Sequence, residues 1–217
     1  MKTRILTLLS LLLYLPLQHL TAQNTPPTSR YSLQLDFGRA KTFHYNAPVF
    51  LILFYEGSIV EKQFARTAPD YLLSVAYDVD TKNSIKIGYG FSQYRFYEKG
   101  LSDVGDGSAF YPYEILWTFK YFQSVLGYRH LLSTAGPISP FLQSEIIGEY
   151  LFKKYYTVNK LGVAVKFGVG TLLRLSKHWS ADLNAFYKTG ITRYNPLPYP
   201  KYIPYSYGLQ AGLNYRF

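Results

Sequence analysis

The sequence predicts an all-β protein, a single antiparallel up-and-down transmembrane β-barrel of about eight strands, preceded by a cleaved signal peptide. Three observations support this fold class. Apolar and polar residues alternate with a period of two in eight separate segments. Short and long connections alternate along the chain between these segments. The beginning of the chain has the composition of an export signal.

The amino-terminal segment has the three parts of an export signal. Lys2 and Arg4 provide the positive charge, residues 5–17 are almost wholly apolar, and Ala22 is a small residue suited to cleavage. The apolar part is too short for a typical membrane-spanning helix, although a retained amino-terminal anchor is the alternative. We therefore expect a signal peptide at 1–22, a short flexible segment at 23–30 and a barrel domain at 31–217, with the exact cleavage site left open.

Composition narrows the possible functions. The chain contains no cysteine, which excludes disulfide scaffolds, thiolate metal sites and cysteine nucleophiles. Its formal net charge of +10 could suit nucleic acid or anionic lipid. No basic run is longer than Lys153-Lys154, so we expect no nucleic-acid partner.

Eight segments alternate between apolar and polar residues. They are residues 31–38, 71–78, 85–92, 113–121, 142–150, 161–170, 179–188 and 205–217. One face of each carries large aromatic and aliphatic residues, while the other carries Gly, Ser and charges. Leu72, Leu116, Phe122 and Ile147 interrupt the polar faces. A soluble sandwich or lipocalin-like barrel would also alternate, but a packed soluble core would not suit the glycine-rich, charged face.

The connections predict which end of the barrel faces the cell exterior. Short connections are expected at 80–83, 133–139 and 175–178, and long ones at 44–70, 97–112, 152–159 and 193–202. Outer-membrane barrels have short periplasmic turns and longer extracellular loops. Within the first long connection, residues 49–55 are strongly apolar, and they could form part of a loop, a lid over the mouth or an additional strand.

The polar faces predict a narrow interior in which opposite charges are paired, because an unpaired buried charge is costly. The expected interior charges are Asp36, Lys86, Glu114, Lys120, Glu145, Glu149, Lys166, Arg174, Asp182, Lys188 and Arg216. Glu145 and Glu149 face the same way on one strand. They could form a general acid–base pair, but ion pairs with Lys166 or Lys120 are the favoured interpretation, since neither His nor Ser is predicted between them.

The end of the sequence resembles the carboxy-terminal strand of bacterial outer-membrane β-barrel proteins. Leu213, Tyr215 and Phe217 match the alternating apolar residues and final Phe of that family. The segment 175–180, Leu-Ser-Lys-His-Trp-Ser, is similar to a periplasmic turn of the small OmpA- and OmpW-type barrels. The resemblance implies an integral protein of a Gram-negative outer membrane, recognised by the barrel-assembly machinery. The tyrosine-rich, cysteine-free composition resembles that of Bacteroidetes proteins.

The long loops carry the remaining binding candidates. Their basic residues could contact lipopolysaccharide phosphates or could simply be solvated. These residues are Lys153, Lys154, Lys160, Arg193 and Lys201. The last loop is rich in Pro and Tyr, so its exposed aromatic side chains could contact an envelope protein or a glycan.

The sequence predicts no catalytic, cofactor-binding or metal-binding residues. Some small outer-membrane barrels modify lipids, yet His44, His130 and His178 form no set with Ser and an acid, and His130 with Ser133 lies near the periplasmic end. The expected function is a structural or binding barrel with a mostly plugged lumen and displayed extracellular loops. A narrow channel for small or apolar solutes is the alternative, and a lipid-modifying enzyme is the third possibility.

Overall fold

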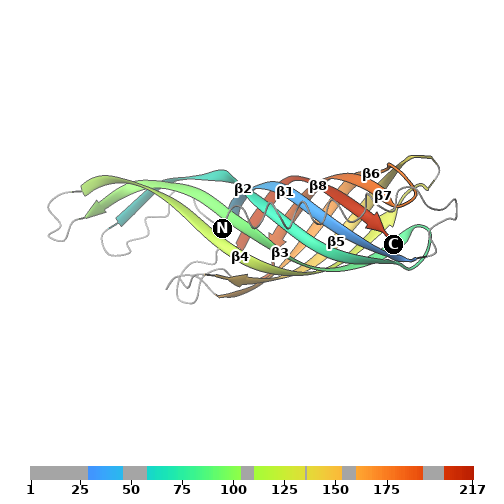
Figure 1. Cartoon of the computed structure of the whole chain (residues 1–217). Helices are drawn as coiled ribbons and strands as arrows, with labels where there is room; N and C mark the ends of the chain where they lie inside the picture. The colour runs from blue at the N-terminus through green and yellow to red at the C-terminus, as the bar shows by residue number, and fades with distance from the viewer. Residues whose placement is uncertain (1–28, 46–57, 104–109, 135, 153–159, 193–202) are drawn as a thin grey trace, which may run out of the picture.

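The computed structural model is a closed antiparallel barrel in which every strand pairs with its neighbours in sequence and β8 pairs with β1 (Figure 1). The structure describes residues 29–45, 58–103, 110–134, 136–152, 160–192 and 203–217. The strands are β1 (Tyr31–Tyr45), β2 (Ser58–Asp78), β3 (Asn83–Asp103), β4 (Phe110–Leu131), β5 (Ile138–Leu151), β6 (Leu161–Arg174), β7 (Trp179–Gly190) and β8 (Ile203–Arg216). The predicted eight-stranded, all-β fold is therefore confirmed.

Parts of the sequence predictions fall outside the described residues. They include the expected signal peptide at 1–22 and the apolar stretch at 49–55. In the described part of the chain, no helix has both the length and the apolar character needed to cross a membrane.

The barrel is apolar outside and polar inside. Ile87 and Leu209 are about three-fifths exposed, at 61% and 60%, whereas Lys86 and Glu145 on the opposite faces are 4% and 3% exposed. A water-soluble barrel would bury its apolar face. An apolar outer face suits contact with the hydrocarbon of a membrane. A closed barrel can also exist there because its backbone hydrogen bonds are all made between strands. The soluble sandwich and lipocalin-like alternatives are thereby excluded.

Three strands, β2, β3 and β4, extend well beyond the others. β1 stops pairing with β2 at Lys41 and Thr67, and β5 stops pairing with β4 at Leu151 and Tyr121. Beyond these points β2, β3 and β4 continue to pair with one another alone. Figure 1 shows their ends at the left of the view, well past the other strands. We call residues 58–66, 95–103 and 110–118 the outer sheet.

The outer sheet corrects two predicted loops. Much of 44–70 and 97–112 is paired strand rather than loop. Neither segment alternates as clearly as a membrane-spanning strand, because outside the bilayer neither face of a sheet has to be apolar. A register shift between Arg66 and Asp70 marks the place where β2 leaves the barrel wall, as β-bulges at barrel rims often do.

The inner and outer faces of β4 are the reverse of those predicted. Phe119 and Tyr121 are buried inside the barrel, while Lys120 is exposed outside. The prediction considered only residues 113–121. The following membrane segment turns Gln123 inward and Phe122 outward, and because a strand alternates strictly, it determines the faces of the whole strand.

The short turns lie together at the end of the barrel opposite the outer sheet. In the β2–β3 turn, the Asp80 carboxylate accepts hydrogen bonds from the backbone N–H groups of Lys82 and Asn83 and from the Asn83 side chain, at 2.7 to 2.8 Å. The bond from the Asn83 side chain is the largest of the effects that lower the pKa of Asp80. This carboxylate therefore stays ionised and keeps the turn tight at neutral pH.

Candidate functional site

The centre of the barrel is built around Glu145 on β5. Its two carboxylate oxygens lie 2.7 Å from Lys86 Nζ and 3.1 Å from Lys166 Nζ. Lys86 also reaches Asp36 at 3.5 Å, and Lys166 donates a hydrogen bond to Gln210 at 2.7 Å. These side chains come from strands on opposite sides of the barrel, so the group spans the interior and leaves no unpaired charge in it.

A second group lies nearer the short turns. Arg129 forms an ion pair with Asp182 at 3.2 Å and donates to the Gln143 side chain at 2.9 and 3.0 Å. Asn214 donates to the same Asp182 oxygen at 3.0 Å. Arg129 is not among the predicted interior charges, because the predicted strand ended at residue 121. The alternation of Phe122 and Leu126 with Gln123 and Gly127 would have identified it.

A third group lies towards the outer rim. Glu149 accepts a hydrogen bond from the Tyr94 hydroxyl at 2.7 Å and pairs with Lys188 at 2.6 Å. Gln123 donates to the same Glu149 oxygen at 3.3 Å. The Lys188 ammonium also lies 5.0 Å from the centre of the Tyr94 ring. Tyr94 was missed because the predicted strand ended at residue 92.

Apolar side chains fill the space between the central and outer groups. Ile147 lies between Glu145 and Glu149 on β5, and it packs with three other buried residues from β2, β4 and β6. This apolar layer consists of Leu72, Val125, Ile147 and Ala164. Leu72 and Ile147 interrupt the alternation in the sequence because both belong to this apolar layer inside the barrel.

The buried charges of the described interior balance. Four are acidic and four are basic: Asp36, Glu145, Glu149, Asp182, Lys86, Arg129, Lys166 and Lys188. Glu145 and Glu149 have separate cationic partners and the apolar layer between them, so their geometry is that of two ion-pair centres rather than a shared acid–base site. Of the two partners predicted for Glu145, Lys166 pairs with it, together with Lys86, whereas Lys120 is on the other side of the wall.

Four predicted interior charges lie elsewhere. Glu114 pairs with Lys99 on the outer sheet, and Lys120 is exposed on the outside of the barrel. Arg174 donates to the carbonyl oxygens of Thr134 and Gly136 at the short-turn rim, and Arg216 pairs with Asp78 there. The first two were misplaced by the reversed faces of β4. The last two are at the ends of their strands, where solvent replaces the barrel wall.

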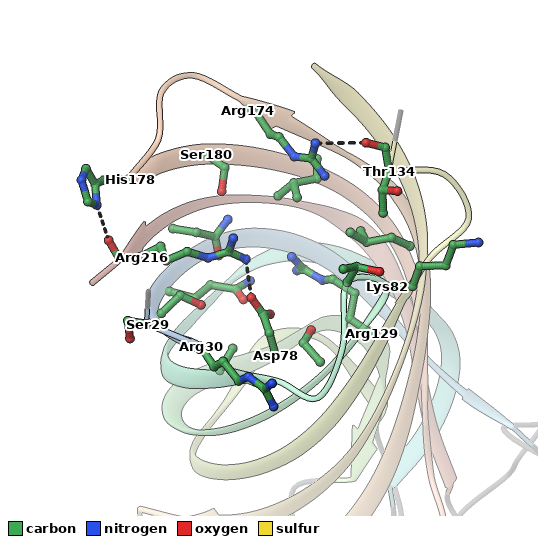
Figure 2. Close-up of a pocket in the computed structure, with 18 of the residues that line it drawn as sticks. Ser29, Arg30, Asp78, Lys82, Arg129, Thr134, Arg174, His178, Ser180 and Arg216 are labelled. Carbon is green, nitrogen blue, oxygen red and sulfur yellow. Dashed lines mark hydrogen bonds and ion pairs between the residues drawn. The ribbon is translucent and has the colours of Figure 1, made fainter. Parts of the chain in front are cut away.

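A cavity of about 680 Å³ lies at the short-turn end of the barrel (Figure 2). Its lining is mostly uncharged, and its charged residues are six basic and two acidic. The charged residues are Arg30, Lys82, Arg129, Arg174, Lys177, Arg216, Asp78 and Asp80. Figure 2 shows Arg216 directed at Asp78 and Arg174 at Thr134. The cavity also reaches Asn214 and Gln34, whose side-chain amide donates a hydrogen bond to Asp36 at 2.7 Å. The excess of basic over acidic residues in its lining favours anions at this end.

The predicted carboxy-terminal assembly residues and one of the predicted loop cations lie within the described part of the chain. Leu213 and Tyr215 lie on the outer face of β8, and Tyr215 contacts the rings of Trp179 and Phe217. Lys160 is exposed, with its ammonium 4.8 Å from the Tyr150 ring. Lys153, Lys154, Arg193 and Lys201 lie outside the described residues.

The predicted histidines show no nucleophile–base geometry in the described part of the chain. His130 Nδ1 lies 2.8 Å from the Asn83 side-chain oxygen, and His178 Nδ1 lies 2.9 Å from the Arg216 carbonyl oxygen. Both rings therefore tie strand ends to the short turns. The backbone of His44 belongs to β1.

No protein-family model matches the sequence, and no curated protein matches it. Solved structures do match. Neisserial surface protein A has a TM-score of 0.53 and 13% identity, over 87% of this chain and 98% of its own. Outer membrane protein OprG from Pseudomonas aeruginosa has a TM-score of 0.49 and 10% identity, over 87% and 96%. Outer membrane protein AlkL has a TM-score of 0.48 and 13% identity, over 91% and 94%.

These similarities concern the fold, and the distribution of side chains agrees with it. The outer surface is apolar and suits lipid, the interior is polar and paired, and short turns and long connections lie at opposite ends. The chain is therefore a small eight-stranded transmembrane β-barrel that shares its fold with Neisserial surface protein A.

Proposed function

We propose that the barrel is a closed anchor in the outer membrane and that the working surface is extracellular, on the outer sheet and the long connections. The observation that carries this proposal is the continuation of β2, β3 and β4 beyond the pairing limits of β1 and β5. Spanning the bilayer needs strands of only about 9–11 residues, whereas these three have 21, 21 and 22. The additional length presents a paired sheet outside the membrane.

The contents of the interior support a closed lumen. Each of the three polar groups joins opposite charges at 3.5 Å or less, and the apolar layer separates two of them. A solute would have to break several buried ion pairs and displace packed aliphatic side chains to pass. Such a barrel resembles the eight-stranded barrels whose interior is filled by side chains.

The outer sheet offers a polar and aromatic surface suited to a protein or glycan partner. Lys99 and the Tyr97 hydroxyl both donate hydrogen bonds to Glu114, and these two bonds lower the pKa of Glu114. Arg66 lies over the Tyr97 ring at 5.5 Å. Side chains fixed by such contacts lose less conformational entropy on binding, which favours their use as a recognition surface.

A narrow channel is the second candidate, and the short-turn cavity is the observation that favours it. The cavity could serve as the entrance for an anion from the periplasmic side. Conduction would then require a rearrangement of the Arg129, Glu145 and Glu149 groups. We propose no enzymatic role, because His130 and His178 contact Asn83 and the Arg216 carbonyl oxygen rather than a nucleophile.

Surface labelling tests the display of the outer sheet. The chain has no cysteine, so a single Lys99→Cys substitution provides one thiol on the outer sheet, and Lys82→Cys provides one at the opposite rim. We expect a membrane-impermeant maleimide to label Lys99→Cys on intact Gram-negative cells. Lys82→Cys should react only after the outer membrane is permeabilised. Labelling of Lys82→Cys but not Lys99→Cys on intact cells would refute the proposal.

A further inference from the structure

Five exposed or half-exposed cations lie on the outer face of four neighbouring strands. We call them the outer basic band: Arg39, Lys41, Arg66, Arg95 and Lys120. Arg39 and Lys41 belong to β1, Arg66 to β2, Arg95 to β3 and Lys120 to β4. Because these strands pair in this order, the cations form one patch on the wall of the barrel rather than five separate charges.

The outer basic band adjoins a row of aromatic side chains on the same face. Phe37, Tyr71, Phe91 and Phe122 lie directly opposite one another across β1 to β4. Arg39 and Lys120 occupy the next outward-facing positions after Phe37 and Phe122, in the direction of the outer sheet. Aromatic residues gather at the interface between hydrocarbon and head groups. A level next to such an aromatic row suits contact with the outer-leaflet head groups.

The charges in this band lack anionic partners. None of the five forms an ion pair within the described residues, although every charged side chain buried in the barrel interior does. Arg66 and Arg95 are also direct cross-strand partners, with their side chains on the same face. Like charges placed opposite each other destabilise a sheet unless an anion lies between them. This pair is therefore the part of the band best suited to a shared anionic ligand.

We infer that the outer basic band binds the phosphate groups of an anionic glycolipid in the outer leaflet. Guanidinium groups bind phosphate oxygens through two parallel hydrogen bonds, and Arg66 and Arg95 supply two such groups. The adjoining aromatic row provides an apolar surface for the acyl chains of the same molecule. A lipid satisfies both surfaces at once, whereas a free phosphate ion satisfies only the charged one. This inference concerns the level at which the barrel wall meets the outer sheet. It rests on the proposed extracellular position of the outer sheet and is independent of the proposed closed lumen.

The inference predicts a position-dependent loss of lipid binding. Each Lys or Arg near an anionic surface contributes about a fivefold change in affinity, so removing three should cost about a hundredfold. The test variant is Arg66→Gln/Arg95→Gln/Lys120→Gln. The matched control is Arg30→Gln/Lys82→Gln/Lys177→Gln, which removes the same charge from exposed residues at the opposite rim. Heat-modifiable gel mobility shows whether both variants fold. The single substitution Lys120→Gln replaces the triple variant if the triple variant does not fold.

Binding is measured in phosphatidylcholine nanodiscs with diphosphoryl lipid A, and with the same lipid after its phosphates are removed. We expect the test variant to lose most of its binding to the diphosphoryl form, the control to retain it, and the dephosphorylated lipid to bind weakly to all. Equal affinities in the test variant and the control would overturn the inference. So would equal binding of the phosphorylated and dephosphorylated lipids, or complete competition by millimolar inorganic phosphate, which would indicate a free-anion site.

Discussion

Replacing Glu145 by Gln is expected to lower the free energy of unfolding by about 3–5 kcal/mol, because it removes one charge from a buried, paired group. Lys86 and Lys166 both point at this carboxylate from within 3.1 Å, and both are nearly fully buried. The substitution leaves two ammonium groups against a neutral amide. Urea unfolding of the protein in detergent, followed by tryptophan fluorescence and heat-modifiable mobility, measures the change.

Glu114→Gln is the matched control for this experiment. Glu114 also pairs with a lysine, but the Glu114 and Lys99 side chains are 50% and 43% exposed. Water and salt already screen that pair, so the free energy of unfolding should hardly change. If the two variants were equally stable, the interior ion pairs would not be the main source of barrel stability.

Gly208→Ala is expected to weaken closure of the barrel, at a cost of about 1–3 kcal/mol, because it places a methyl group against the backbone of the next strand. A Cβ at this position would lie 2.1 Å from the Arg39 carbonyl oxygen and 2.8 Å from the Ala40 Cα. Gly208 pairs with Ala40 in the seam between β8 and β1. The backbone must therefore shift there, and the fraction of heat-modifiable folded protein should fall.

Gly38→Ala is the control in the same seam. A Cβ on Gly38 would meet its nearest neighbours, Asp70 Cβ and the Leu209 carbonyl oxygen, at 3.4 Å, which is an ordinary contact. This variant should fold and unfold much like the parent chain. A greater loss of stability in Gly38→Ala than in Gly208→Ala would show that the close backbone approach does not explain the requirement for glycine.

The wall of the barrel was predictable where a strand faces lipid on one side. β1 and β5 to β8 must be apolar outside and polar inside, so their alternation is regular and identifies the inward residues, such as Asp36, Glu145, Lys166 and Lys188. The physical constraint acts on both faces at once. A shift of one residue in the strand register would turn the inward charges towards the membrane.

The outer sheet and β4 were harder to predict because that constraint is absent outside the bilayer. Strands that pair in water need only backbone hydrogen bonds, so Tyr97 and Lys99 can share a face with Leu116. In β4, Phe119 and Tyr121 are inside because the membrane-facing half of the strand begins only after them. Tyr94 and Arg129 were missed because the predicted strands stopped short of them, at residues 92 and 121.

The sequence predicted most of the charged residues that share the interior, but not which of them pair with one another. The sequence placed Glu145 and Lys166 in one interior, but their pairing follows from the register between β5 and β6, in which they are direct partners. Lys86 reaches Glu145 from β3, across the intervening β4. Such contacts depend on the tilt and closure of the barrel, which are properties of the whole sheet.

Single-channel recording tests the closed anchor most directly. Purified protein would be inserted into planar lipid bilayers, with heat-modifiable mobility showing that it is folded. The three polar groups and the apolar layer predict a silent baseline at both voltage polarities, because a lumen closed by them would leave no open path from the short-turn cavity to the outer rim. Reproducible conductance steps from folded protein would contradict the closed lumen and would make the cationic cavity the entrance of an anion channel.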